Sequence, residues 1–354
     1  MMGKLLKISI FGESHGEGVG LILEGFPAGI KVDHDLIRSN LARRAGGNDL
    51  FSTPRKESDD IRFVSGIFEG YTTGAPICIL IPNENTRSGD YAQLKSRMRP
   101  NHSDYTAQAK YHGYNDYRGG GHFSGRLTTA LVAGGALAIQ YLSEQGIKVG
   151  GHIFNIGEAY DDPFPLNPDF SLINKDFPVL NTDAGEQMKE EINHARMNLG
   201  SVGGSVEVAV TGVPVGIGEP FFDSVESILS HWYFSIPAVK AVEFGLGMEF
   251  AESLGSEVSD SMYYEGDKVL TKTNNCGGIC GGITNGMPIK AILTFKPTSS
   301  IAQKQQSVNL ETKENITLEV KGRHDPCIVK RAVPVVESVT ALALLDLYME
   351  GKCR

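Results

Sequence analysis

Two long apolar segments, Leu131–Tyr141 and Val333–Leu347, constrain the fold of this chain more than any other feature. The first is too short to cross a bilayer, which takes about 20 residues, and the charged residues Glu337 and Asp346 interrupt the second. A helix that is apolar around its whole circumference has to be covered by other parts of the protein. We therefore expect two buried core helices and no membrane span.

Local signals predict where both core helices begin and end. The first is expected at Gly125–Gln145, followed by Gly146, a residue that suits a helix C-terminus. The second is expected at Pro326–Gly351, with Asp325 as N-cap and Pro326 at the first helical position. Shorter helices are predicted at Asp33–Arg43, Ser103–His112, Gly185–Asn198 and Asp223–Trp232.

Segments rich in β-branched residues alternate with these helices and predict strands. They are Lys4–Phe11, Gly20–Leu23, Ile61–Gly66, Ala75–Ile81, Ser205–Thr211, Met287–Phe295 and Thr317–Val320. Surface loops are expected at Asp161–Pro178 and Ala302–Asn315. No tandem repeat and no linker rich in Pro or Ser divides the 354 residues. The pattern favours the α+β class and a single domain over residues 1–354.

The net charge of −9 limits the partners of this chain. Nucleic acid needs a basic surface and is not expected, whereas a small anion can bind where arginines gather locally. Lys4 and Lys7 interrupt the apolar N-terminus, so we expect no secretory signal and a cytoplasmic protein. Cys276 and Cys280 have no second cysteine pair or nearby histidine, so no metal site is expected.

A glycine-flanked turn, Gly12–Gly16 (GESHG), follows the first predicted strand. Glycine on both sides lets backbone approach a ligand closely. His15 is then offered at a strand end, a common position for catalytic groups. The alternative is a polar turn whose histidine only caps the next element.

A second glycine-rich segment, Tyr117–Arg126, holds three consecutive glycines and leads into the first core helix. Unpaired N–H groups and the helix dipole make such a helix N-terminus suitable for an anion. The segment does not match the usual dinucleotide fingerprint, and it lacks the Gly-Lys-Ser/Thr of a P-loop.

Two further polar segments suit anionic ligands. Arg99–Tyr105 (RPNHSDY) places His102 near a helix start, and Lys296–Ser300 offers one cation and three hydroxyls at a strand end. The planar fork of arginine suits carboxylate and phosphate. Arginines in or near the polar segments are Arg43, Arg44, Arg55, Arg99, Arg126 and Arg323. Capping turns and scattered surface salt bridges are the alternative interpretation.

Taken together and in order, these segments resemble the chorismate synthase family along essentially the whole chain. The longest matching stretches are Gly12–Gly29, Gly119–Leu137 and Gly322–Ser338. Shorter matches lie at Thr53–Glu57, Ser65–Ile77, Arg99–Tyr105, Gly212–Pro220 and Gly277–Ser300.

The resemblance implies a lyase of the shikimate pathway, which supplies aromatic amino acid biosynthesis. Such an enzyme converts 5-enolpyruvylshikimate 3-phosphate to chorismate by 1,4-elimination of phosphate, and it requires reduced FMN although no net redox change occurs. The resemblance also implies a β-α-β sandwich, in which helices pack between two antiparallel sheets, and a homotetramer.

Roles for individual residues follow from the same resemblance. His15 would act as an acid beside the departing phosphate, His102 would stabilise or protonate the reduced flavin, and Asp325 would accept a proton. Anionic groups of the substrate or of a pyridine nucleotide such as NADP would meet Arg43, Arg44, Arg99 and Arg126. FMN contacts would come from His122, Phe123, Ser124, Pro237, Ala238, Gly281, Lys296, Pro297, Thr298, Ser299, Ser300 and Arg323.

The chain departs from the family pattern at several of these positions. Asn101 stands where Gly is usual, a mild change because Asn tolerates a left-handed backbone. His122 and Phe123 replace Arg-Ser, which removes a cation from the flavin site, and Pro237 replaces an Asn side chain. Leu50 stands where many members carry an arginine assigned to pyridine nucleotide, which weakens the case for NADPH.

Two other functions compete with the lyase. A flavin- or NADP-linked oxidoreductase built on Gly119–Gly125 would consume its reductant stoichiometrically. An anion-binding or scaffold module would show no flavin-dependent activity, and its histidines would only cap helices.

Overall fold

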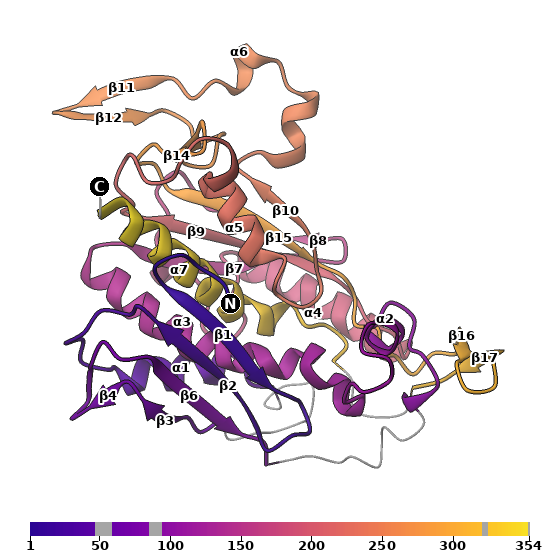
Figure 1. Ribbon diagram of the computed structural model, residues 1–354. Coiled ribbons are helices and arrows are strands. Elements are labelled where there is room, and N and C mark those ends of the chain that lie inside the picture. The colour runs from indigo at the N-terminus through magenta and orange to yellow at the C-terminus, as the bar shows by residue number, and fades with distance from the viewer. Residues whose placement is uncertain (47–58, 85–93, 321–324, 353–354) are drawn as a thin grey trace.

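The computed structural model describes residues 1–46, 59–84, 94–320 and 325–352 (Figure 1). A four-stranded antiparallel sheet has the order β1-β2-β6-β3. Its strands are β1 (Lys7–Gly12), β2 (Gly18–Glu24), β3 (Arg62–Ser65) and β6 (Ile77–Pro82). Alternate residues of β6 are buried, as expected for a strand with one face on the core.

A five-stranded antiparallel sheet has the order β10-β15-β9-β7-β8. Its strands are β7 (Lys148–Ile156), β8 (Ala159–Tyr160), β9 (Gly204–Thr211), β10 (Val239–Phe244) and β15 (Ile289–Phe295). In its register Gly204 lies opposite Phe295 and Ile156, whereas Thr211 lies opposite Lys148. We refer to these two ends as the Gly204 end and the Thr211 end.

The two core helices, α3 (Thr128–Glu144) and α7 (Val329–Lys352), pack on each other and on the sheets. Helix α3 contacts β2 and β6 of the smaller sheet and β7 of the larger one, and α7 contacts β7 and β9 (Figure 1). Helices α1 (His34–Arg44) and α5 (Val225–Tyr233) also pack against α7. The core therefore lies along α3 and α7.

Within the described chain, α7 alone is long and apolar enough to span a bilayer, and 94% of its apolar window is buried in the protein. Both apolar segments are thus buried helices, as predicted, and the mixed α+β class is confirmed. The first core helix begins with a 3-10 turn, η3 (Gly125–Leu127).

Strand β7 was not predicted, and the reason is local. Gly150 and Gly151 interrupt the run of β-branched residues that predicts a strand. In the sheet, their lack of a side chain leaves space for Phe170 and Glu337 to pack against the strand. A Cβ on Gly150 would overlap the ring of Phe170, and one on Gly151 would lie 3.3 Å from the Glu337 side chain. The loop expected at Ala302–Asn315 is wrong in part, because it contains β16.

The remaining elements connect or extend the two sheets. Helices are α2 (Asp104–Lys110), η2 (Arg118–Phe123), η4 (Phe170–Leu172), α4 (Thr182–Met197), η5 (Phe221–Asp223), η6 (Gly247–Glu252) and α6 (Gly255–Val258). Strand pairs are β4 (Ile67–Phe68) with β5 (Tyr71–Thr72), β11 (Met262–Glu265) with β12 (Lys268–Thr271), β13 (Ile279–Cys280) with β14 (Ile283–Thr284), and β16 (Gln305–Asn309) with β17 (Glu314–Leu318).

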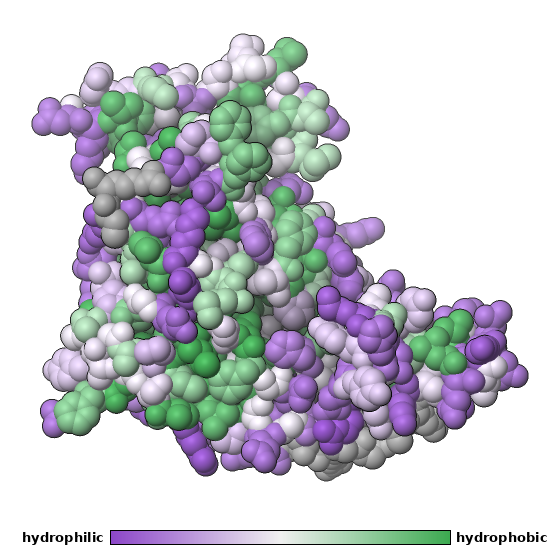
Figure 2. Space-filling model, in the orientation of Figure 1, coloured by the Kyte–Doolittle hydropathy of each residue, from purple (hydrophilic) through white to green (hydrophobic). Residues whose placement is uncertain are grey.

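The β11–β12 hairpin and the preceding α6 project from the body of the molecule (Figure 1). Apolar side chains lie on the surface of this projecting region (Figure 2). Met248 in η6, Leu254 immediately before α6 and Met262 in β11 are all exposed.

Candidate functional site

The two glycine-rich segments form one structural unit. Ser14 N donates to the carbonyl of Gly121 over 3.1 Å, and Nδ1 of His122 lies 2.8 Å from the carbonyl oxygen of Gly12. Gly119–Gly121 all have positive φ, between 52° and 83°, which lets the loop fold against the turn after β1. Two motifs more than 100 positions apart in the sequence thus meet.

The glycine loop also brings His15 and His102 to neighbouring positions. A Cβ on Gly119 would overlap the ring of His15 and lie 2.8 Å from Ser14 Oγ. A Cβ on Gly120 would lie 3.5 Å from Nε2 of His102. His15 is buried, and His102 is partly exposed. Two imidazoles therefore face consecutive residues of one loop.

His102 belongs to a cluster with Arg99 and Asp104. Its Nδ1 lies 2.6 Å from Asp104 Oδ1, and Arg99 binds the same carboxylate through Nε at 2.7 Å and a terminal nitrogen at 2.8 Å. Arg99 also donates to Ser300 Oγ over 3.0 Å. Burial lowers the pKa of His102, and Arg99 and Lys296 lower it further, against the opposing effect of Asp104. The guanidinium of Arg99 is therefore already bound to Asp104 and Ser300 in this structure.

The segment Lys296–Ser300, which follows β15, connects the His102 cluster to the start of β10. Lys296 Nζ donates to Ser299 Oγ over 2.7 Å, and Ser299 donates to the carbonyl of Asn101 over 2.9 Å. Lys296 N donates to the carbonyl of Ala238 over 3.0 Å. Burial lowers the pKa of the Lys296 ammonium, and Lys240 adds to this effect. The segment predicted to bind FMN thus lies beside the His102 motif.

A cavity of about 480 Å³ lies against this segment. It is lined by Asn101, Lys296 to Ser299, and the α4 residues Glu191 and His194.

Asp325 lies next to this segment but does not cap α7. Thr298 Oγ1 donates to the Asp325 carbonyl over 2.7 Å. The expected N-cap role is wrong, because α7 begins four residues later, at Val329. The carboxylate instead accepts from Arg331 over 2.7 Å, and Arg331 Nε donates to the carbonyl of Arg44 over 3.0 Å.

Arg44 and Arg126 share the buried carboxylate of Asp59. Arg126 pairs with one oxygen of Asp59, and Arg44 lies 3.5 Å from the other. Arg44 also donates to Thr128 Oγ1 over 3.2 Å, and Arg126 Nε donates to Asn83 Oδ1 over 3.0 Å. The pair places two guanidinium groups and one carboxylate at the start of the first core helix.

Arg43 has a different partner. Its two terminal nitrogens bind the two oxygens of Glu337 on α7 at 2.6 and 2.9 Å, and Glu337 also accepts from Gly151 N over 3.0 Å. This bidentate pair ties α1, α7 and β7 together, so it accounts for the guanidinium without a substrate anion.

Three other residues predicted to contact FMN, Ser124, Phe123 and Pro237, lie in different parts of the structure. Ser124 Oγ accepts from Arg126 N over 3.3 Å and caps η3. Phe123 is exposed near the ring of Tyr111, at a centroid separation of 6.3 Å. Pro237 precedes Ala238 and is therefore adjacent to Lys296.

Gly281 is not brought to this cluster. It lies in the β13–β14 hairpin, where Ile283 bridges to Gly218 near the Thr211 end, whereas Lys296 follows the Gly204 end (Figure 1). Arg323 and Leu50 lie outside the described residues.

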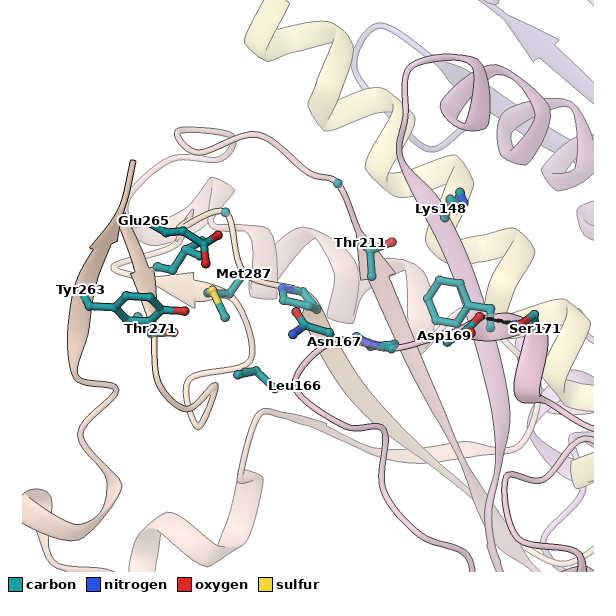
Figure 3. A pocket seen from close by; sticks show the side chains of 16 residues that line it. Lys148, Leu166, Asn167, Asp169, Ser171, Thr211, Tyr263, Glu265, Thr271 and Met287 are labelled. Atoms are coloured by element: carbon teal, nitrogen blue, oxygen red, sulfur yellow. Dashed lines mark hydrogen bonds between the residues drawn. The ribbon is translucent and has the colours of Figure 1, made fainter. Parts of the chain in front are cut away.

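A separate cavity of about 570 Å³ lies at the Thr211 end (Figure 3). It is lined by Lys148, Thr211, Phe170 and residues of the β11–β12 hairpin such as Tyr263 and Glu265. It contains none of the residues predicted for catalysis.

Sequence patterns did not indicate three acidic or basic partners: Asp59, Asp104 and Arg331. Asp104 had a usable signal, because it follows His102 by two residues at a helix start, where an acid is favoured. Asp59 and Arg331 gave no local signal, since each is defined by partners distant in the sequence.

The fold is of the α+β class, and its candidate site places two histidines against consecutive residues of one glycine-rich loop. Residues 6–349 match the family model described as chorismate synthase. The chain belongs to the chorismate synthase family, lyases that form chorismate in the shikimate pathway, and this family requires reduced flavin.

Named relatives and a solved structure agree with this assignment. The chain is 48% identical to chorismate synthase of Pyrococcus abyssi, over 98% of this chain and 96% of the relative. It is 45% identical to that of Methanocaldococcus jannaschii, over 99% and 96%. A crystal structure of chorismate synthase superposes with a TM-score of 0.76 and 29% identity, covering 98% of this chain and 93% of the other.

Proposed function

We propose that this chain converts 5-enolpyruvylshikimate 3-phosphate to chorismate and phosphate by 1,4-elimination in the presence of reduced FMN. The observation that carries the proposal is the placement of His15 and His102 against Gly119 and Gly120 of one loop. Together with Lys296 and the paired arginines, they supply proton donors and positive charge for a polyanion.

The residues around the glycine loop fit a flavin and a phosphorylated substrate. Gly120 leaves room where a side chain would press on His102. Among the described residues, the buried Ser14 Oγ has no hydrogen-bond partner, so a ligand atom can satisfy it. Lys296 and the hydroxyls of Thr298, Ser299 and Ser300 would hold FMN, with backbone from Ala238. When bound, the reduced flavin supplies electron density that helps phosphate to leave.

The side chains then have separate tasks. His15 donates a proton to the departing phosphate, and His102 holds a proton beside the flavin. A nearby anion raises the pKa of an imidazole, which opposes the lowering of the His102 pKa by burial. Asp325, whose carboxylate accepts a hydrogen bond from Arg331, takes the ring proton. Arg44 and Arg126, with Arg323, orient the anionic groups of the substrate, and Arg99, while paired with Asp104, adds positive charge.

We infer that the chain folds as one domain of the β-α-β sandwich type and assembles as a cytoplasmic homotetramer. Contacts of α3 with both sheets support the sandwich. Exposed Met248, Leu254 and Met262 support subunit contacts, because apolar side chains gathered on a surface favour association.

Anaerobic assay with dithionite-reduced FMN tests the function. We expect equal amounts of chorismate and phosphate, many turnovers per flavin, and no stoichiometric loss of reductant. Consumption of one reductant per phosphate would instead support the oxidoreductase. Failure to form chorismate with reduced FMN would reject the lyase.

A further inference from the structure

Asp104 is a buried carboxylate that holds two functional side chains at once. It is the first residue of α2, and its Oδ1 lies 2.6 Å from Nδ1 of His102. Its Oδ2 accepts from Arg99 Nε at 2.7 Å and from Arg99 N at 3.1 Å. No other carboxylate is described within salt-bridge distance of His102.

These contacts decide where the proton of His102 lies. Burial raises the pKa of Asp104, but hydrogen bonds from Arg99 and His102 outweigh burial and hold it well below its usual range. An ionised carboxylate only accepts hydrogen bonds, so Nδ1 of His102 has to carry the proton. The lone pair of neutral His102, and the second proton of the cation, are then on Nε2.

The Nε2 edge is the one that faces the site. A Cβ on Gly120 would lie 3.3 Å from Cε1 and 3.5 Å from Nε2 of His102. Nε2, which is directed to the glycine loop, is therefore the nitrogen that exchanges a proton, while Nδ1 is bound by Asp104 on the opposite side of the ring.

We propose that Asp104 is the positioning residue of His102: its carboxylate fixes the Nδ1–H tautomer, directs Nε2 to the glycine loop, and balances the nearby cations. This inference deepens the proposed function and rests on it for the role of His102. The charge balance follows from Arg99, whose terminal nitrogen lies 3.2 Å from Nδ1, and from Lys296. Among the described residues, the charged neighbours that remain without Asp104 are Arg99 and Lys296, and both disfavour the imidazolium.

Titration of His102 by NMR tests the proposal without flavin or substrate. Asp104→Asn retains an oxygen that accepts from Nδ1–H but removes the charge. We expect the pKa of His102 to fall by about 1–3, the range for losing a close opposite charge. Ser103→Ala is the matched control, because Ser103 Oγ lies 3.4 Å from the same nitrogen but carries no charge, and it should leave the pKa nearly unchanged. An equal pKa in Asp104→Asn and wild type would overturn the proposal.

The wild-type protein supplies an independent measurement if the variant does not fold. The ¹⁵N shifts of His102 above its pKa should report protonated Nδ1 and unprotonated Nε2. The opposite tautomer would reject the proposal whatever the variant does. Asp104→Glu, which restores the charge, should recover part of the His102 pKa.

Activity separates positioning from a purely structural role. If His102 acts as the cation, the high-pH fall in kcat should move to lower pH in Asp104→Asn, while KM changes less than kcat. A lower melting temperature with unchanged pH profile and unchanged His102 pKa would leave Asp104 as an anchor for Arg99 only. Absence of chorismate formation in wild type would reject the proposed function, and the NMR result would still decide the role of Asp104.

Discussion

At the scale of single residues, Gly119 shows how a missing side chain creates the candidate site. Its φ is +58°, and a Cβ there would overlap the His15 ring and approach Ser14 Oγ. Gly70 also has positive φ, +81°, but no described atom lies within 4 Å of its Cβ position. A side chain would therefore strain the backbone at both positions, but only at Gly119 would it also overlap neighbouring atoms.

This difference gives a prediction for Gly119→Ala. Both Gly119→Ala and Gly70→Ala place Ala in the left-handed region, at a cost of about 1–2 kcal/mol in stability. Only Gly119→Ala should displace His15, so its turnover should fall about 100-fold or more, the lower range for losing an acid–base group. Chorismate formation and thermal melts of both variants make the measurement. Equal turnover in the two would show that His15 does not depend on the loop.

At the scale of elements, a buried ionic cluster holds the long segment after β8 onto the larger sheet. His152 on β7 is fully buried, with Nδ1 2.9 Å from Asp161 and Nε2 2.9 Å from Glu207 on β9. Lys290 on β15 lies 3.9 Å from Glu207. Asp161 also accepts from Leu180 N at 2.6 Å, so the cluster ties both ends of the segment together.

Stability should therefore depend on pH above neutrality. Burial lowers the pKa of His152, but the hydrogen bonds to Asp161 and Glu207 outweigh burial and raise it above the ordinary value of 6.5. A raised pKa stabilises the fold fully below pH 6.5. That stabilisation is lost as the pH rises from there through the pKa of the folded protein. The loss is about 1.4 kcal/mol for each pH unit between the pKa values of the unfolded and folded states.

Urea unfolding between pH 6 and 9 measures this effect. His152→Gln should remove the alkaline loss of stability and lower the free energy of unfolding at pH 6 by about 3–5 kcal/mol, because two buried carboxylates lose the imidazolium that lies between them. His194→Gln, at an exposed position on α4, is the control and should retain the wild-type pH dependence. A variant with an unchanged alkaline slope would contradict the assignment.

At the scale of the whole molecule, α3 and α7 join the two sheets through a close backbone approach. A Cβ on Gly135 would lie 2.6 Å from Cα of Ser338 on α7. Such a contact cannot be relieved by rotating a side chain, because backbone lies in the way.

Gly135→Ala should therefore destabilise the protein although alanine favours helices. Helix propensity alone would add about 1 kcal/mol of stability. We expect a net loss of about 1–3 kcal/mol, from forced separation of the two helices. Gly255→Ala in α6, where no described atom lies within 4 Å of the Cβ position, should be neutral or stabilising. Denaturant unfolding compares them, and a stabilised Gly135→Ala would show that α3 and α7 have room to move.

By itself, the sequence determined the two buried helices, the α+β class and most strands of the two large sheets, because apolar periodicity and turn residues act locally. It also identified the motifs of the family and both histidines. It did not predict β7, because Gly150 and Gly151 resemble a turn until Phe170 and Glu337 pack against them.

Only the tertiary structure decided which charged groups are paired. Asp325 binds Arg331 and does not cap a helix, and Arg43 binds Glu337, a residue 294 positions away. Arg99, predicted to clamp an anion, shares the carboxylate of Asp104 with His102. Residue type specifies a charge, but the partner of that charge is set by helices and sheets that bring distant segments together, which no local pattern encodes.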